Sequence, residues 1–222
     1  MSVGLGAVWV LVCVWLGGAA GLITQEPLPY ALDALEPHLS RRNMELHFHR
    51  HHAAYVAKAN ALLPPDASDA QLPELLRRAD GPLRAHLGQH FNHQFFWRAI
   101  RPGGGGSPGG ALLEKIERQF GSIDEFRSQF KERAAKHFGS GWAWLTMEPS
   151  SEELRIETTA NGDFPTRSLP LLTLDLWEHS WYPTYENRKA DYIESYLQHL
   201  VNWPFAENLY DEILRGKAKA EL

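Results

Sequence analysis

The sequence predicts an α+β protein, in which an N-terminal α-helical hairpin is followed by an α/β domain with a three-stranded antiparallel sheet. Two long helical patterns with a compact connection predict the hairpin. Three short strand patterns and further helices in the second half predict the α/β domain. Residues 101–110 are rich in glycine and interrupt helices. We therefore expect one domain at residues 26–104 and another at residues 105–222.

Composition narrows the class of protein. The chain has 222 residues, of which 44% are hydrophobic and 11% aromatic, enough to build a substantial core. Its net charge of -5 argues against a general nucleic-acid binder. Cys13 is the only cysteine in the sequence, so the folded part has no disulfide, zinc–thiolate site or cysteine nucleophile. Eleven histidines hint at metal binding.

The first 25 residues form an apolar segment without a charged side chain. The segment is typical of a targeting or anchor sequence, with small residues at 18–20 for cleavage. Uncleaved, residues 1–23 are just long enough to contact or span a membrane. We therefore expect a secretory route or membrane anchoring, with plastid or mitochondrial import and a start codon further downstream as alternatives. The segment is excluded from the predicted fold.

The helical hairpin is predicted from caps and breakers. Ser40 can cap a helix over about residues 41–63, which the two prolines at 64 and 65 end. A small helix is expected within residues 66–80, and a second long helix over about residues 83–100.

One face of the first long helix is expected to be buried. Helical periodicity places His47, His51 and Tyr55 on that face, which Ala54 also lines. The same periodicity turns His49 and His52 away, toward an interface or solvent.

The second half changes from helices to strands and back. A helix is expected at residues 111–120, and Ser122 with Glu125 forms a capping-box pattern for the next, which runs to about residue 137. Alternating apolar and polar residues predict three strands, with two helices after them. The strands are expected at 142–147, 154–159 and 170–176, and the helices at 187–200 and 204–215.

Polar side chains interrupt the end of the third predicted strand. Residues 172–181 begin as a strand pattern and then run into Asp175, Trp177 and His179. Burying a carboxylate is costly unless a cation pairs with it, and carboxylate and imidazole both bind transition metals. Trp177 and Trp181 would shield such a site from water. The stretch alone fits a metal site and a buried Asp–His hydrogen bond equally well.

The hairpin offers further ligands. His47 and His51 share a helix face, and Gln89 lies one helical turn before His93. A glutamine in that position can hydrogen-bond a solvent molecule at a metal and tune its pKa. A core histidine with an ordinary hydrogen bond and a helix-surface glutamine explain the same residues, so spacing leaves both interpretations open.

Several segments, taken together and in order, resemble the iron/manganese superoxide dismutases. The match covers the chain from about residue 27 to its C-terminal end. The matching segments are 28–38 (LPYALDALEPH), 44–47 (MELH) with His51, His52 and Tyr55, 92–93 (NH) before 96–97 (FW), 138–144 (FGSGWAW), 175–179 (DLWEH) with Tyr182, 187–188 (NR) and 201–203 (VNW).

This resemblance implies one metal ion and a solvent molecule bound to it. It implies that Tyr55, with His51 behind it, gates a substrate channel and relays protons, and that Gln89 holds the solvent molecule. The implied metal ligands are His47, His93, Asp175 and His179. The implied aromatic shell is Trp97, Trp142 and Trp177.

The resemblance also implies a second subunit. Glu178 would reach across the interface of a homodimer to the partner's His179, with Tyr182 and His51 at the same junction. A tetramer is the alternative assembly. Arg188 would lie near the mouth of the channel, in a locally positive funnel that speeds the capture of an anion by an acidic chain.

The position of the glutamine that holds the solvent molecule predicts which metal is bound. In iron-type members of the family it comes from the second helix, as Gln89 does, whereas in manganese-type members it usually comes from the turn where this chain has Gly162. The chain therefore looks iron-type, with manganese or use of either metal as alternatives. Residues 95–97 and 102–106 also resemble the iron enzymes of plant and algal plastids.

The expected function is the disproportionation of superoxide to dioxygen and hydrogen peroxide by one metal ion that alternates between the +3 and +2 states. The tuning residues Gln89 and Tyr55 favour this function over the alternative, a non-catalytic metal-binding protein with the same fold. Neither function involves a nucleic acid.

Overall fold

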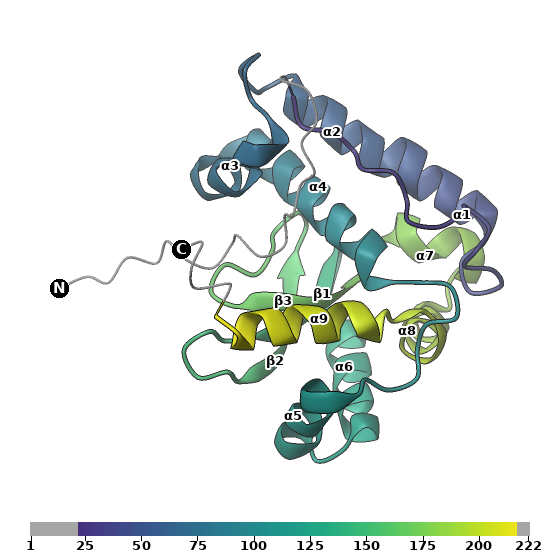
Figure 1. The fold of residues 1–222 in the computed structure, drawn as a ribbon. Coiled ribbons are helices and arrows are strands. Elements are labelled where there is room, and N and C mark those ends of the chain that lie inside the picture. The colour runs from purple at the N-terminus through teal and green to yellow at the C-terminus, as the bar shows by residue number, and fades with distance from the viewer. Residues whose placement is uncertain (1–21, 217–222) are drawn as a thin grey trace.

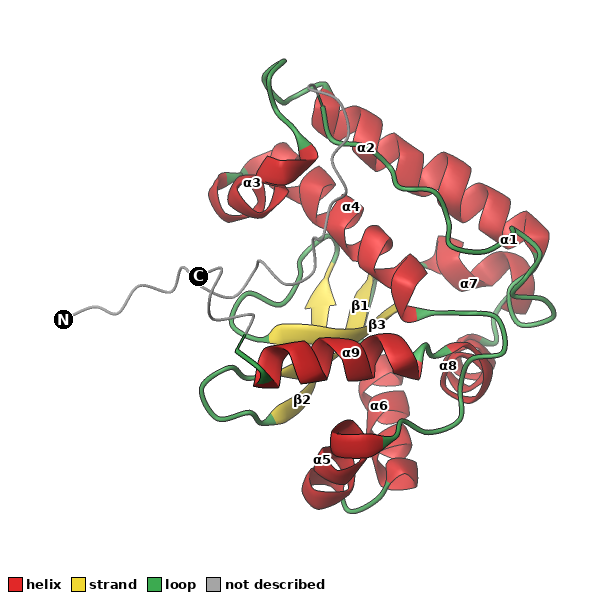
Figure 2. Cartoon of the chain, in the orientation of Figure 1, coloured by secondary structure: helices red, strands yellow, loops and turns green. Residues whose placement is uncertain are grey.

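Helices surround a central three-stranded sheet in the computed structural model, which describes residues 22–216 (Figure 1 and Figure 2). The helical arm of the first half leads to the sheet and helices of the second half. In chain order the elements are α1 (Arg41–Leu46), a π-helix (His47–His52), α2 (Ala53–Asn60), a 3-10 turn (Asp69–Gln71), α3 (Leu72–Arg78), α4 (Gly81–Ala99), α5 (Gly110–Phe120), α6 (Ile123–Lys136), β1 (Gly141–Met147), β2 (Leu154–Ala160), β3 (Leu169–Asp175), α7 (Glu178–Tyr185), α8 (Lys189–Ser195), a second π-helix (Tyr196–Leu200) and α9 (Trp203–Leu214).

The predicted hairpin is confirmed. Helices α1 and α2 and the π-helix between them form one long arm, and α4 packs against α2 (Figure 1). Ser40 caps the arm, because its hydroxyl accepts a hydrogen bond of 3.1 Å from the backbone N–H of Asn43. The arm ends at Asn60, earlier than expected.

The buried face of the arm differs from the predicted one, because six residues of it are π-helical. The Ala53 N–H bonds the carbonyl of Phe48, five residues back, so the turn is wider than an α-helical turn. The extra width rotates His52 inward, where it is fully buried. The prediction that His52 faces an interface or solvent is therefore wrong, as is the prediction that Ala54 lines the buried face, since Ala54 is exposed.

The sheet has the strand order β2-β1-β3, and both pairings are antiparallel, as predicted. Helices α4 and α9 contact β3, whereas α6 contacts β1 and β2. Every residue of β1 and β3 is buried, whereas β2 is partly exposed. In the register of β1 and β3, Trp142 lies opposite Asp175, so the last residue of β3 is held inside the core.

Helix α7 was not predicted. It begins directly after the third strand, with Glu178 and His179 in its first turn. The residue before the helix is Trp177, whose side chain makes no capping bond, so the sequence has no start signal there. Pro183 lies inside the helix, and a proline at an interior position argues against a helix.

The excluded N-terminal segment proves to be folded at its end. Ile23 is 1% exposed and belongs to the hydrophobic core. Its backbone N–H and carbonyl both bond the Asn60 side chain, at 3.0 Å and 2.9 Å. Apolar composition alone could not separate this core contact from the targeting pattern before it. The rest of that pattern, residues 1–21, lies outside the described residues.

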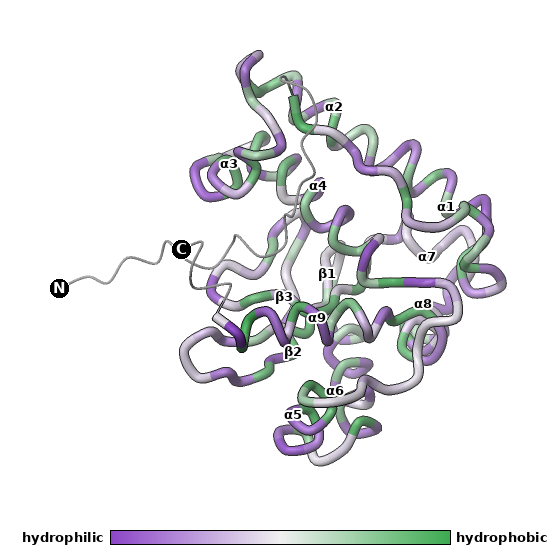
Figure 3. The backbone as a smooth tube through the Cα atoms, in the orientation of Figure 1, coloured by the Kyte–Doolittle hydropathy of each residue, from purple (hydrophilic) through white to green (hydrophobic). Residues whose placement is uncertain are grey.

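Hydropathy follows the layers of the fold. Figure 3 shows hydrophobic stretches in the strands and on the helices beside them, interrupted by hydrophilic positions along each helix. Among residues 22–216, no helix is both long enough and apolar enough to cross a bilayer.

Candidate metal centre

Four elements bring four potential metal ligands together. His47 comes from the π-helix, His93 from α4, Asp175 from the end of β3 and His179 from the first turn of α7. These elements meet between the hairpin and the sheet (Figure 1). One ligand atom from each residue lies within 4.8 Å of all the others. Three of the residues are fully buried, and the His179 side chain is 11% exposed.

The separations of these atoms fit a transition-metal ion. Asp175 Oδ2 lies 3.0 Å from Nε2 of His47, 3.6 Å from that of His179 and 3.7 Å from that of His93. Bonds of about 2.1 Å to one ion separate two ligand atoms by about 3.0 Å at right angles and by about 3.6 Å at 120°. Among the described residues, none of the four atoms has an aligned hydrogen-bond partner. Buried atoms of this kind need a partner, and a metal ion supplies one.

The protonation states also suit a metal. Burial lowers the pKa of His47 to about 4, although Asp175 opposes the shift, and burial lowers the pKa of His93 well below its usual range. Burial would raise the pKa of Asp175, but contacts with His179 and His47 hold it below the ordinary value. The site therefore holds a carboxylate and neutral imidazoles, which are the forms that bind metals.

Neighbouring groups orient two of the ligands. The backbone N–H of Trp177 donates to Asp175 Oδ1 at 2.8 Å, which leaves Oδ2 for the site. His93 Nδ1 lies 2.7 Å from the carbonyl of Gln89. Because a carbonyl only accepts, Nδ1 carries the proton of His93 and Nε2 is free to bind a metal.

The predicted aromatic shell surrounds the ligands. Ring centroids of Trp97 and His47 are 4.6 Å apart, those of Trp142 and His93 are 5.0 Å apart, and those of Trp177 and His179 are 5.6 Å apart. The indole N–H groups of Trp142 and Trp177 both donate to the Asn161 carbonyl, each at 3.0 Å. The turn after β2 thus fixes two walls of the site. Trp181 is buried and bonds the Leu176 carbonyl.

Gln89 is buried one helical turn before His93. Within the described part of the chain, its Oε1 atom has no hydrogen-bond partner. Gly162, in the turn after β2, lies against it, since a Cβ atom on Gly162 would be 3.1 Å from Gln89 Cγ. The side chain of Gln89 therefore fills space that a larger residue at position 162 would need.

Tyr55 and His51 lie at a half-buried edge of the site. Tyr55 is 5.4 Å from His93 between ring centroids, and burial, helped by Asp175, raises the pKa of its hydroxyl to about 12. His51 stacks on His179 with centroids 4.0 Å apart. Burial and the nearby His179 lower the pKa of His51.

The remaining predicted residues are exposed. Glu178 and Tyr182 lie on the outer side of α7. Arg188 precedes α8 and pairs with Asp191 at 3.2 Å. These residues do not line the inner cluster.

A second group of buried polar residues was missed. His52 Nε2 lies 2.9 Å from His90 Nδ1, while His52 Nδ1 lies 3.0 Å from Gln25 Nε2 and 3.1 Å from Trp97 Nε1. The ring of His52 also stacks on that of His93, at 5.2 Å. The adjacent pair His51–His52 was the available signal, and an α-helical period assigned it to the wrong side.

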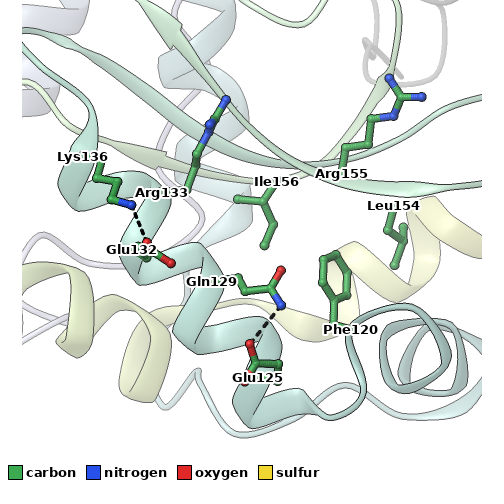
Figure 4. A pocket seen from close by; sticks show the side chains of 9 residues that line it. All are labelled: Phe120, Glu125, Gln129, Glu132, Arg133, Lys136, Leu154, Arg155 and Ile156. Atoms are coloured by element: carbon green, nitrogen blue, oxygen red, sulfur yellow. Dashed lines mark hydrogen bonds and ion pairs between the residues drawn. The ribbon is translucent and has the colours of Figure 1, made fainter.

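A separate pocket of about 700 Å³ lies between α6 and β2 (Figure 4). Phe120, Leu154 and Ile156 form its apolar part. The acidic side chains on its rim are already engaged, since Lys136 pairs with Glu132 and Gln129 bonds Glu125 (residues drawn in Figure 4). It shares no lining residue with the metal cluster.

Comparison with known proteins gives two family-model matches. Residues 24–101 match the alpha-hairpin domain of iron/manganese superoxide dismutases, and residues 108–209 match the C-terminal domain of the same enzymes.

Curated relatives agree with these matches. The chain is 45% identical to the superoxide dismutase [Fe] of Legionella pneumophila, over 83% of this chain and 97% of the relative. It is 40% identical to the superoxide dismutase [Mn/Fe] of Methylomonas sp., over 86% and 98%. It is 42% identical to the superoxide dismutase [Mn] of Bordetella pertussis, over 83% and 92%. Overall identity therefore does not separate iron from manganese.

Proposed function

Because the chain belongs to the iron/manganese superoxide dismutase family, we propose that it converts two superoxide ions and two protons into dioxygen and hydrogen peroxide. The observation that carries this conclusion is the convergence of four buried ligand atoms, each without an aligned hydrogen-bond partner in the described residues. The residues that would hold the metal are His47, His93, Asp175 and His179.

A bound iron or manganese ion supplies one-electron chemistry by alternating between the +3 and +2 states. Two superoxide ions repel each other, so a site that treats them one at a time removes this barrier. The chain contributes one carboxylate charge from Asp175 and neutral imidazole ligands, which are buried and packed against the indole shell. A drier surrounding strengthens every charge interaction within the site.

We propose that Gln89 holds a solvent molecule at the centre and shifts its pKa. Support comes from its buried Oε1 atom without a partner among the described residues and from its position one turn before His93. A side chain at position 162 would crowd Gln89, so a glutamine on α4 fits best with a glycine in the turn. This arrangement favours the iron-type assignment made from the sequence. Use of manganese, or of either metal, is the alternative.

Tyr55 is the proposed proton donor and gate. A tyrosine hydroxyl is protonated at neutral pH, and burial keeps Tyr55 so by raising its pKa to about 12. Its position beside His93 at the half-buried edge of the site lets it offer that proton to peroxide as it forms. His51, stacked on His179, would form the other side of the gate.

We further propose a homodimer, with a tetramer as the alternative, in which Glu178 contacts the partner's His179. Support comes from a pocket of about 480 Å³ beside His179, lined by Glu178 and Lys189, and from the exposure of Tyr182. Sedimentation of the wild type and of Glu178→Ala tests this proposal. A wild-type monomer with full activity would rule it out.

Arg188 is proposed to lie in a positive funnel that attracts superoxide. Its guanidinium is exposed, although Asp191 partly neutralises it. Ionic strength should lower the rate of capture, and more so in the wild type than in Arg188→Ala. A rate independent of salt would count against the funnel.

The apolar segment within residues 1–23, up to but not including the buried residue Ile23, is proposed to direct or anchor the protein, through secretion or membrane attachment. Import into a plastid or mitochondrion is the alternative. The likeness of residues 95–97 and 102–106 to plastid iron enzymes supports import into a plastid, whereas the relatives compared above are bacterial. Fusing residues 1–23 to a fluorescent reporter distinguishes these locations, and a diffuse reporter would contradict all of them.

Metal-defined expression tests the function itself. Protein purified from medium supplied with iron or with manganese should carry one ion per chain and dismutate superoxide in proportion to that ion. Metal binding without dismutation would instead identify a non-catalytic metal-binding protein. Activity with manganese alone would contradict the iron-type assignment drawn from the position of Gln89.

A further inference from the structure

Residues 22–26, termed the strap here, lie along the helical hairpin. Asn60 bonds both backbone groups of Ile23, and the carboxylate of Asp69 accepts from the N–H and the hydroxyl of Thr24, at 2.8 Å and 2.6 Å. These bonds at two successive residues fix the position of the strap on the hairpin. It therefore delivers the next side chain, Gln25, to a fixed place.

That place is the π-helix that carries His47. The Gln25 side-chain nitrogen lies 3.0 Å from the carbonyl oxygen of Phe48 and 3.0 Å from His52 Nδ1. A carbonyl oxygen can only accept, so the NH2 group of Gln25 faces it and the amide orientation is settled. The same NH2 group then donates to His52 Nδ1.

The Phe48 carbonyl takes two donors because the turn is wide. It accepts from the Ala53 N–H, which closes the π-turn, and from Gln25. π-turns are rare within helices, and the second donor at this carbonyl stabilises the wide turn at the residue next to His47.

His52 is fixed from the same side. Trp97 Nε1 can only donate, so His52 Nδ1 accepts two hydrogen bonds and its proton lies on Nε2, which donates to His90 at 2.9 Å. The ring held in this way stacks on His93 at 5.2 Å, and Trp97 packs edge-on against His47 at 4.6 Å.

His47 needs this support more than His93 does. A metal-binding histidine almost always donates its second N–H to an acceptor, which orients the ring. His93 does so, but within residues 22–216 His47 Nδ1 has no hydrogen-bond partner. Its orientation therefore rests on its backbone turn and on the rings around it.

We propose that Gln25 is a positioning residue for the metal ligands His47 and His93. Its amide group acts through the Phe48 carbonyl and the His52 ring, so a residue of the N-terminal strap tunes how firmly the centre holds its ion. The inference rests on the metal centre proposed above.

Metal release tests the proposal. Wild type and Gln25→Met, a variant of similar size without the donor, are loaded with manganese(II) and mixed with excess EDTA, and the release of the ion is followed with time. We expect Gln25→Met to release the ion several-fold faster, up to the roughly tenfold that follows loss of a group bonded directly to a metal ligand, because Gln25 acts through Phe48 and His52. Its manganese(II) EPR spectrum should also change, because the ligand rings shift.

Thr24→Val is the matched control. It removes the Thr24 hydroxyl bond to Asp69, which does not touch the π-helix, but keeps the backbone bond from Thr24 to Asp69 and both bonds from Ile23 to Asn60. The strap therefore stays in place, and Thr24→Val should release the ion within about twofold of the wild-type rate, as expected for a surface substitution. Equal acceleration in both variants, or a wild-type rate and spectrum in Gln25→Met, would overturn the proposal.

Gln25→Glu provides a second variant if Gln25→Met does not fold. Its carboxylate cannot donate to the Phe48 carbonyl and would repel it. This variant should therefore also release manganese faster, and a wild-type rate would likewise overturn the proposal. A wild type that binds no metal would defeat the metal centre itself, a result distinct from failure of the role of Gln25.

Discussion

Gly162 packs directly against the side chain of Gln89 in the core: a Cβ atom on Gly162 would lie 3.1 Å from the Cγ atom of Gln89. The turn after β2 approaches α4 closely at this point, since a Cβ atom on Gly88 would clash with the Gly162 carbonyl oxygen. The absence of side chains at 88 and 162 lets the turn settle on the helix. The glutamine beside the metal ligands is thus held by a glycine distant in sequence.

Gly162→Ala should disturb this arrangement. The new methyl group would meet the Ala85 carbonyl oxygen at 2.7 Å and press on Gln89, so we expect a loss of about 1–3 kcal/mol in unfolding free energy, typical of overpacking. Turnover should fall with it, measured beside urea unfolding. Gly109→Ala is the control, because its nearest contact would be 3.9 Å away. Equal stability and turnover in both variants would contradict the close packing of Gly162 against Gln89.

Gln89→Leu should separate metal binding from turnover. Leucine cannot hydrogen-bond solvent, but it leaves the four ligands in place, so the metal content should stay near that of the wild type. Turnover should drop by about tenfold or more. Metal analysis and dismutation rates on one sample measure both. Gln129→Leu, on the surface helix α6, controls for the substitution, and unchanged turnover in Gln89→Leu would remove its role.

Acid should destabilise the metal-free protein. Burial lowers the pKa of both His47 and His90 to about 4 in the folded state, against about 6.5 in an unfolded chain. Between these values the unfolded state binds more protons, so stability is lost as the pH falls from about 6.5 to about 4. The free energy of unfolding, obtained from urea titrations, should fall by several kcal/mol over this range, and the urea midpoint should fall with it. A midpoint independent of pH over this range would show that these histidines titrate normally.

The sequence predicted the framework of the fold because its signals are local. Alternation marked residues 154–159 as a strand, and the observed strand extends this range by one residue. Ser122 accepts from the backbone N–H of Glu125, as its capping pattern required. The four ligands come from four separate elements, so their meeting could be expected from family resemblance but not from spacing.

The misses have physical causes. A π-helix has no composition signature, so the inward turn of His52 could not be read from a period of 3.6 residues. Helix α7 lacks a capping side chain and contains Pro183, both of which argue against a helix in sequence. Ile23 looked like the end of a targeting segment because core residues and targeting segments are equally apolar.

Ile23→Ala should therefore cost stability. Ile23 is 1% exposed, and large-to-small substitution of a buried side chain costs about 2–5 kcal/mol. Leu22→Ala is the matched control, because Leu22 is 39% exposed and should lose much less. Urea unfolding measures both. If Ile23→Ala were as stable as Leu22→Ala, residues 22–25 would not belong to the folded core.

Anomalous X-ray diffraction at the iron absorption edge tests the central claim most directly. Crystals of the iron-loaded protein should show one strong peak per chain, at about 2.1 Å from the ligand atoms of His47, His93, Asp175 and His179. A peak elsewhere, such as beside the stacked pair His38 and His199, or no peak in an iron-containing active protein, would contradict the assignment.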